Sequence, residues 1–84
     1  MYLGMPSAGE EVRILQEFLN QFIPTPPLLR EDGIFGPKTK ARVILFQQQA
    51  GLVPDGIVGP KTGQALVGRA LAITISGSQA ARRV

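Results

Sequence analysis

The chain has 84 residues, of which 44% are apolar and 18% charged, a balance typical of one compact globular domain. It contains no cysteine and no histidine, which excludes disulfides and thiolate metal sites and removes the commonest general base, so we expect no enzyme activity, metal or cofactor. Nine Lys and Arg residues against six Asp and Glu residues give a net charge of +3, which mildly favours anionic partners.

The first predicted element is a helix over Ala8–Phe22. Ser7 and Glu10 have the three-residue spacing of a capping box, and the apolar residues that follow recur every three or four positions. The proline-rich Pro24–Pro27 ends the helix, because proline lacks the backbone N–H that a helix requires. Residues 1–8 are interpreted as a separate N-terminal segment, which does not have the basic-then-apolar layout of a secretory signal.

An octapeptide then occurs twice, as DGIFGPKT in Asp32–Thr39 and as DGIVGPKT in Asp55–Thr62. Each copy predicts a tight Asp-Gly turn followed by a helix that begins at the proline. The first copy leads into a predicted helix over Pro37–Ala50, and the second into a helix from Pro60 to Val67 or Ala70. The repeat is therefore interpreted as one device, a turn that starts a helix, used twice.

Together these elements predict an all-α fold, a small three-helix bundle whose repeated loops lead into the second and third helices. We expect this domain to span residues 9–70. The apolar, β-branched Leu71–Ile75 is expected to form an extended strap and Gly77–Val84 a frayed end or linker, so that residues 71–84 form a separate tail. No stretch is apolar over the roughly 18 residues that a membrane span requires.

Five motifs follow one another in a fixed order between about Gly9 and Val67. They are EV-x-x-LQ from Glu11, DGIFG-x-x-T from Asp32, V-x-x-FQ from Val43, GL at Gly51 and DGIVG-x-x-T from Asp55. A single DG-x-x-G motif is a weak indication, whereas the full ordered set is specific. In this order the sequence resembles the peptidoglycan-binding type 1 domain family.

The resemblance implies a three-helix fold and a non-catalytic module that holds an attached or associated wall-active protein, such as a wall hydrolase, against bacterial peptidoglycan. The implied ligand is the glycan strand or the stem peptide, and further implied partners are a catalytic domain or a secretion or phage component. The expected location is the cell wall or periplasm, reached as part of a larger protein or by a non-standard route. Three features depart from the family pattern. Arg42 stands where alanine is frequent, the segment after the first predicted helix carries the proline-rich PTPPLLRE, and the tail Leu71–Ser76 (LAITIS) is not part of the pattern.

Six polar residues are candidates for ligand binding: Asp32, Asp55, Lys38, Lys61, Gln16 and Gln47. The aspartates either accept hydrogen bonds from sugar hydroxyls or a stem-peptide amine, or cap amides of their own loops, which we favour. The glutamines bind either N-acetyl groups of the sugars or the backbone of the loops. The lysines, which oppose the dipole of the helices they begin, either attract an anion such as a stem-peptide carboxylate or are simply solvated, which we favour.

The alternative function is that of a basic three-helix domain that binds nucleic acid or a protein partner. It would use Lys38, Lys40, Arg42, Lys61, Arg69 and the Arg82-Arg83 tail. These residues are spread over two predicted helices and a tail, and no residue set suits the reading of base edges. We therefore expect neither nucleic-acid binding nor a membrane contact.

Overall fold

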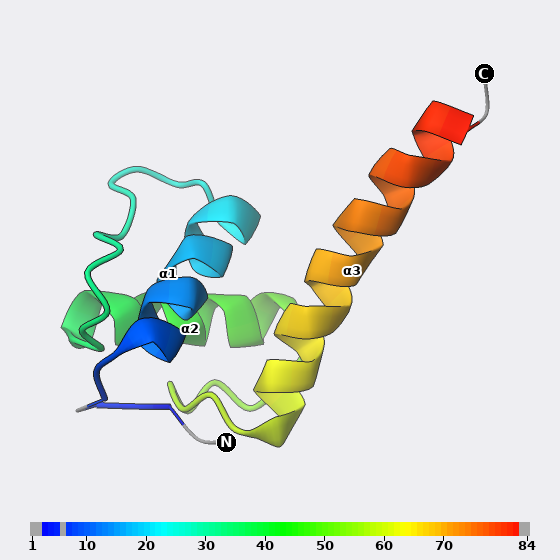
Figure 1. Cartoon of the computed structure of the whole chain (residues 1–84). Helices are drawn as coiled ribbons and strands as arrows, with labels where there is room; N and C mark the ends of the chain where they lie inside the picture. The colour runs from blue at the N-terminus through cyan, green and yellow to red at the C-terminus, as the bar shows by residue number, and fades with distance from the viewer. Residues whose placement is uncertain (1–2, 6, 83–84) are drawn as a thin grey trace.

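Three helices form the fold (Figure 1) in the computed structural model, which describes residues 3–5 and 7–82, with side chains described up to Ala72. α1 spans Glu10–Phe22, α2 spans Pro37–Gln49 and α3 spans Pro60–Arg82. α1 lies across α2, and the C-terminal half of α3 projects beyond both (Figure 1). The predicted all-α three-helix fold is thus confirmed. No helix within the described ranges is long and apolar enough to cross a membrane.

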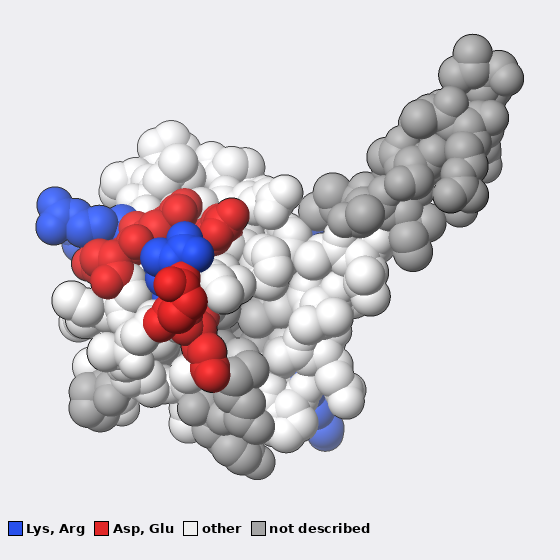
Figure 2. All heavy atoms as spheres, viewed as in Figure 1, with Lys and Arg blue, Asp and Glu red and all other residues white. Residues whose placement is uncertain are grey.

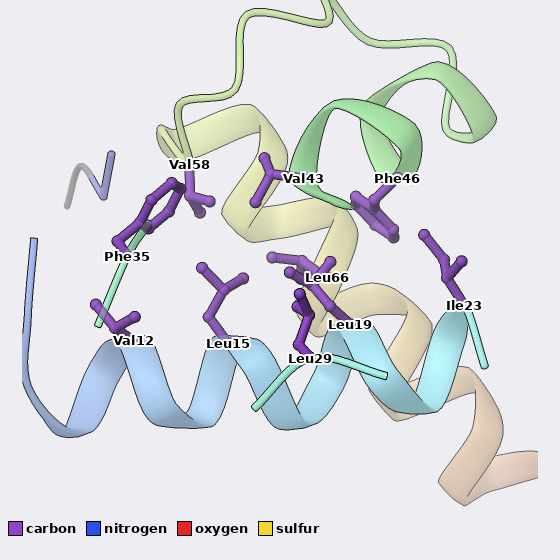
Figure 3. Close-up of a cluster of buried hydrophobic side chains, with 10 residues drawn as sticks. All are labelled: Val12, Leu15, Leu19, Ile23, Leu29, Phe35, Val43, Phe46, Val58 and Leu66. Atoms are coloured by element: carbon purple, nitrogen blue, oxygen red, sulfur yellow. The ribbon is translucent and has the colours of Figure 1, made fainter. Parts of the chain in front are cut away.

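Buried apolar side chains from all three helices and from both repeated loops form one core (Figure 3). They are Val12, Leu15, Leu19, Ile23, Leu29, Phe35, Val43, Phe46, Val58 and Leu66. Phe35 and Val58 occupy the one position at which the octapeptides differ, and they are only 2% and 3% exposed. Burying a side chain of this kind stabilises a fold by roughly 1.5–3 kcal/mol. The two residues therefore anchor both loops to the core.

The start of α1 differs from the prediction. The helix begins at Glu10 with Gly9 as its N-cap, and no side chain caps it, so the predicted capping box is wrong. The hydroxyl of Ser7 instead accepts a hydrogen bond from the N–H of Gly4, at 3.3 Å. The backbone explains the change, because the carbonyl of Ser7 accepts from the N–H of Phe35 and holds this segment against the first loop.

The N-terminal segment pairs with both repeated loops. Leu3 exchanges two backbone hydrogen bonds with Val58, at 3.0 and 2.7 Å, in an antiparallel bridge. A second bridge joins Ala8 to Ile34, next to a 2.8 Å bond from the N–H of Gly9 to the carbonyl of residue 33. Residues 3–5 and 7–9 thus connect the two loops, which are far apart in the sequence.

The end of α2 follows the prediction closely. Gly51 has a φ of +72°, and the N–H of Leu52 donates to the carbonyl of Gln47 at 2.8 Å. This is the six-to-one bond of a Schellman motif, which a glycine in the left-handed region makes possible. It sends the chain from α2 directly into the second octapeptide.

The end of α3 does not follow the prediction. Leu71–Ile75, expected to be an extended strap, is helical, and the helix continues to Arg82. No proline follows residue 60, and alanine and leucine favour the helical state, so local signals to stop the helix are weak. Of the tail predicted over Gly77–Val84, residues 83–84 lie outside the described residues.

Candidate ligand-binding site

Each repeated loop is folded around the side-chain amide of one buried glutamine. Gln16 of α1 and Gln47 of α2 are both 1% exposed. The Gln16 carbonyl oxygen accepts the N–H of Gly33, and the Gln47 carbonyl oxygen accepts the N–H of Gly56, at 2.9 Å in both loops. The amide nitrogens donate to the backbone carbonyls of the next residues, at 2.9 Å in the first loop and 3.0 Å in the second.

The same amide nitrogens also reach the first turn of the following helix. Gln16 donates to the hydroxyl of Thr39 and Gln47 to that of Thr62, both at 3.1 Å. No buried side-chain polar atom in the described part of the chain lacks a partner. The glutamines are therefore part of the scaffold: they bond loop backbone, which is one of the two roles that the sequence left open, and they do not face solvent.

The aspartates complete each loop from its outer side. One Asp32 oxygen accepts the N–H of Ile34 at 3.0 Å and the Gln16 amide at 3.2 Å. The matching Asp55 oxygen accepts the N–H of Ile57 at 2.9 Å and the Gln47 amide at 3.0 Å. The bond from the Ile34 N–H lowers the pKa of Asp32, and that from the Ile57 N–H lowers the pKa of Asp55. In both loops the second carboxylate oxygen has no hydrogen bond from the described residues, and both side chains are exposed.

The glycine of each Asp-Gly turn is required by its geometry. Gly33 has a φ of +75° and Gly56 of +76°, in the left-handed region that side chains other than glycine rarely adopt. A Cβ added at Gly33 would stand 2.9 Å from the carbonyl oxygen of Gly9, and one at Gly56 would stand 2.8 Å from Cγ of Lys40. Neighbouring atoms thus fill the space beside both turns.

A groove of about 640 Å³ runs beside the second loop. It is lined by Gly51, Leu52, Val53, Asp55, Ile57, Gly59, Pro60, Lys61 and Thr62. A smaller hollow of about 330 Å³ lies between this loop and the N-terminal segment, and Asp55 and Ile57 line both spaces. Volumes of roughly 300–1,000 Å³ are usual for sites that bind small ligands. The groove is therefore large enough to be a binding site, and it is the larger of the two spaces that Asp55 and Ile57 line.

The six candidate residues from the sequence fall into three groups: those that line the groove, those on the first loop and the two buried glutamines. Asp55 and Lys61 line the groove together, whereas Gln47 lies buried behind it. Asp32 and Lys38 take the equivalent places on the first loop, with Gln16 buried behind them. Both lysines are exposed and form no ion pair with the described residues.

Sequence reasoning missed the apolar part of the groove. Val53 is 75% exposed and Ile57 45%, and both line it beside Pro60. The available signal was an isoleucine at the same position of both octapeptides, Ile34 and Ile57. Exposed aliphatic side chains around a groove are typical of a site that covers a ligand.

Two of the basic residues that would serve nucleic-acid binding, Arg42 and Arg69, are engaged within the protein. The guanidinium of Arg42 donates to three backbone carbonyls of the proline-rich segment, those of Ile23, Thr25 and Pro27, at 3.0–3.2 Å. That of Arg69 lies 5.7 Å from the ring centroids of Phe22 and Phe46. Arg42, which departs from the family pattern, thus holds the proline-rich segment that follows α1.

Carboxylates gather on the face of the molecule that Figure 2 shows. Arg13 of α1 lies among them and forms ion pairs with Glu10 and Glu17. In the described residues, no group of three or more acidic side chains is arranged to hold a metal ion. This face of mixed sign does not provide the basic surface that a nucleic-acid backbone requires.

Comparison with known proteins gives consistent matches. The sequence profile of the family described as "putative peptidoglycan binding domain" matches residues 8–66. The zinc D-Ala-D-Ala carboxypeptidase of Streptomyces albus G is 50% identical over 60 residues, which cover 71% of this chain and 24% of that enzyme. The chain therefore spans about a quarter of the length of this relative.

Two solved structures share the fold. The crystal structure of the SleB N-terminal domain matches with a TM-score of 0.75 and 33% identity, over 82% of this chain and 92% of that chain. The crystal structure of the Burkholderia AP3 phage endolysin matches with a TM-score of 0.69 and 39% identity, over 79% of this chain and 24% of that chain. The matches thus include part of an endolysin and part of a carboxypeptidase.

Proposed function

The chain belongs to the family of putative peptidoglycan-binding domains, as its ordered motifs imply, and on this premise we propose that it binds bacterial peptidoglycan in the groove beside the second octapeptide loop. The observation that carries the proposal is the position of Asp55 and Lys61. Both line an open groove, and each has polar atoms without a partner in the described residues.

The groove is built on a rigid frame, which suits a binding site. The buried Gln47 amide fixes the loop from behind through Gly56, Ile57 and Thr62. The groove therefore keeps its shape before a ligand arrives, and little conformational entropy is lost on binding.

We propose further that the module is non-catalytic and anchors a wall-active protein. The chain lacks histidine and cysteine, and its relatives include wall enzymes of which it matches only a part. Binding to the wall raises the effective concentration of an attached enzyme near its substrate. This role places the protein in the cell wall or the periplasm, as part of, or in association with, a larger assembly.

Co-sedimentation with purified, insoluble peptidoglycan sacculi tests the proposal. The chain is expected to pellet with sacculi, and Ile57→Ser is expected to leave more protein in the supernatant, because it removes an apolar part of the groove. Ile34→Ser is the matched control, since Ile34 occupies the equivalent exposed position of the first loop. A wild-type chain that stays in the supernatant at low salt, while it retards DNA in a gel, would refute the proposal in favour of nucleic-acid binding.

A further inference from the structure

We propose that the groove beside the second loop binds the peptide of peptidoglycan, and not its glycan strand. The inference rests on the proposed function and adds the chemical class of the ligand. Three features support it: the aliphatic lining of the groove, the pair of opposite charges within it, and the contrast with the equivalent face of the first loop.

The lining of the groove lacks the side chains that suit sugar rings. The faces of aromatic rings provide the broad, flat apolar surfaces against which rings can stack. None of the nine residues that line the groove is aromatic. Phe35 and Phe46 are buried in the core, and Phe18 and Phe22 pack against it. The groove instead offers the aliphatic side chains of Leu52, Val53, Ile57 and Pro60, which match small alkyl groups such as the methyl groups of alanine.

The groove also holds one positive and one negative group. Lys61 supplies an ammonium, and Asp55 supplies a carboxylate oxygen that accepts no bond from the described residues. The bond from the N–H of Ile57 lowers the pKa of Asp55, so the carboxylate stays ionised at neutral pH. In the intact wall the lactyl carboxyl groups are amide-linked to stem peptides, so the glycan strand presents hydroxyl and acetamido groups without charge. A stem peptide presents carboxylates and the amine of its dibasic residue, and so can pair with both groups.

The first loop shows what the same scaffold looks like without these features. The buried amide network is nearly identical in the two loops, with matched distances that differ by at most 0.2 Å. Outside the network the loops diverge. Val53 and Pro54 precede the second octapeptide, whereas the charged, exposed Arg30 and Glu31 precede the first. The first loop keeps an exposed isoleucine, Ile34, and a lysine, Lys38, at the matching positions, but the charged Arg30 replaces Val53 and so interrupts the aliphatic wall.

This duplication supplies a control within one molecule. Lys61→Gln removes the ammonium from the groove, and Lys38→Gln removes the equivalent ammonium from the first loop. Both side chains are exposed, so neither change affects the core. Val53→Arg gives the second loop the residue that stands at this position before the first loop, and it replaces an exposed residue of the aliphatic wall with a charge. None of the hydrogen bonds of the Gln47 side chain involves Val53.

The test compares two soluble competitors for sacculus binding: stem peptide released from sacculi by an amidase, and glycan strands freed of peptide. Stem peptide is expected to displace the bound chain in a dose-dependent way. Glycan strands freed of peptide carry lactyl carboxylates for Lys61 but no amine for Asp55 and no alkyl side chains for the aliphatic wall, so they are expected to displace the chain much less at the same concentration. Titration of the stem peptide should show about a twofold to fivefold weaker affinity for Lys61→Gln, as for an exposed ion pair, with Lys38→Gln unchanged. Val53→Arg should weaken binding as well.

The outcomes distinguish a failure of the peptide assignment from a failure of the proposed function. If glycan strands displace the chain and stem peptide does not, the peptide assignment is wrong while binding to the wall stands. If Lys38→Gln weakens binding as much as Lys61→Gln, the groove is not the site. If the wild-type chain does not sediment with sacculi at all, the proposed function itself fails. Circular dichroism of each variant confirms that a lost affinity does not come from a lost fold.

Discussion

Among single residues, Gln47 and Gln16 have the greatest structural consequence. Each amide is buried, lies on a different helix and holds a complete loop through backbone and side-chain bonds. A buried amide of this kind stabilises a fold because the groups it bonds would otherwise lose water without gaining a partner. The role of Gln47 in the site is indirect, since it fixes the loop that carries Asp55, and Gln16 fixes the first loop in the same way.

Replacing Gln47 by alanine should destabilise the protein by about 2–4 kcal/mol. The change leaves the N–H of Gly56, the carbonyl of Ile57 and the hydroxyl of Thr62 without their shared partner. Urea unfolding followed by circular dichroism measures the loss. Gln48→Ala, on the exposed side of α2, is the matched control and should change stability by less than about 0.5 kcal/mol. Equal stability of the two variants would contradict this account of the loop.

The two turn glycines should respond differently to the same substitution. Both changes to alanine force a left-handed backbone, which costs about 1 kcal/mol. The new Cβ at Gly33 meets a backbone carbonyl of Gly9, whereas that at Gly56 meets the flexible side chain of Lys40, which can move aside. Gly33→Ala should therefore lower the unfolding midpoint in urea more than Gly56→Ala. Gly63→Ala lies inside α3 with open space around it and should raise the midpoint. A lower midpoint for Gly56→Ala than for Gly33→Ala would contradict the geometry.

The two aspartates predict how stability depends on pH. In the folded protein the pKa of Asp32 and of Asp55 is lowered, first of all by a backbone N–H donor. A carboxyl group with a lowered folded pKa stabilises the fold fully above its unfolded pKa of about 3.9, and the effect disappears as the pH falls through the folded pKa. The free energy of unfolding, measured by urea titration at several pH values, should therefore decrease as the pH is lowered past about 4. The decline should be shallower in a variant with Asp32→Asn and Asp55→Asn, and an equally steep decline would contradict the assignment.

Among the elements, the proline-rich segment between α1 and the first loop depends on side chains of the helices. Arg42 of α2 donates to three of its carbonyls, and Asn20 of α1 binds both the N–H and the carbonyl of Leu29. A segment rich in proline has few N–H groups for bonds of its own, so helix side chains satisfy its carbonyls instead. Two helices thus hold in place a connection that has no regular secondary structure of its own.

Arg42→Ala should destabilise the protein by about 1–2 kcal/mol, because three charge-assisted bonds are lost at a partly exposed site. Arg42→Lys should recover only part of the loss, since a single ammonium cannot reproduce the planar fork that reaches three carbonyls. Thermal unfolding of both variants, with the exposed Arg30→Ala as a control, measures the difference. Full recovery by lysine would show that charge alone matters at this position.

Local signals predicted the starts of α2 and α3 and the end of α2, because proline at the first position and glycine after the last act within one turn of helix. They did not predict the start of α1, where Ser7 pairs through its backbone with Phe35 in place of capping the helix. They also missed the continuation of α3, since Leu71–Ile75 satisfies a strand preference and a helix equally well. The groove escaped prediction because Val53 and Pro60 are brought together only by the fold.

The whole molecule consists of two similar units followed by a helix. Each unit is a helix with an inward glutamine and a loop that the glutamine holds, and α3 begins where the second loop ends. The first unit carries an additional proline-rich segment and charged flanks, whereas the second carries the groove. One copy of the device thus serves mainly to build the fold, and we propose that the other also binds the ligand.

The most direct test of this account is a chemical-shift map of the labelled chain, recorded in ¹H–¹⁵N spectra during titration with soluble peptidoglycan fragments. The account predicts that the amides of residues 51–62 shift together and saturably, while those of residues 28–39 stay in place. Shifts confined to the first loop, or spread over the basic residues without saturation, would contradict it.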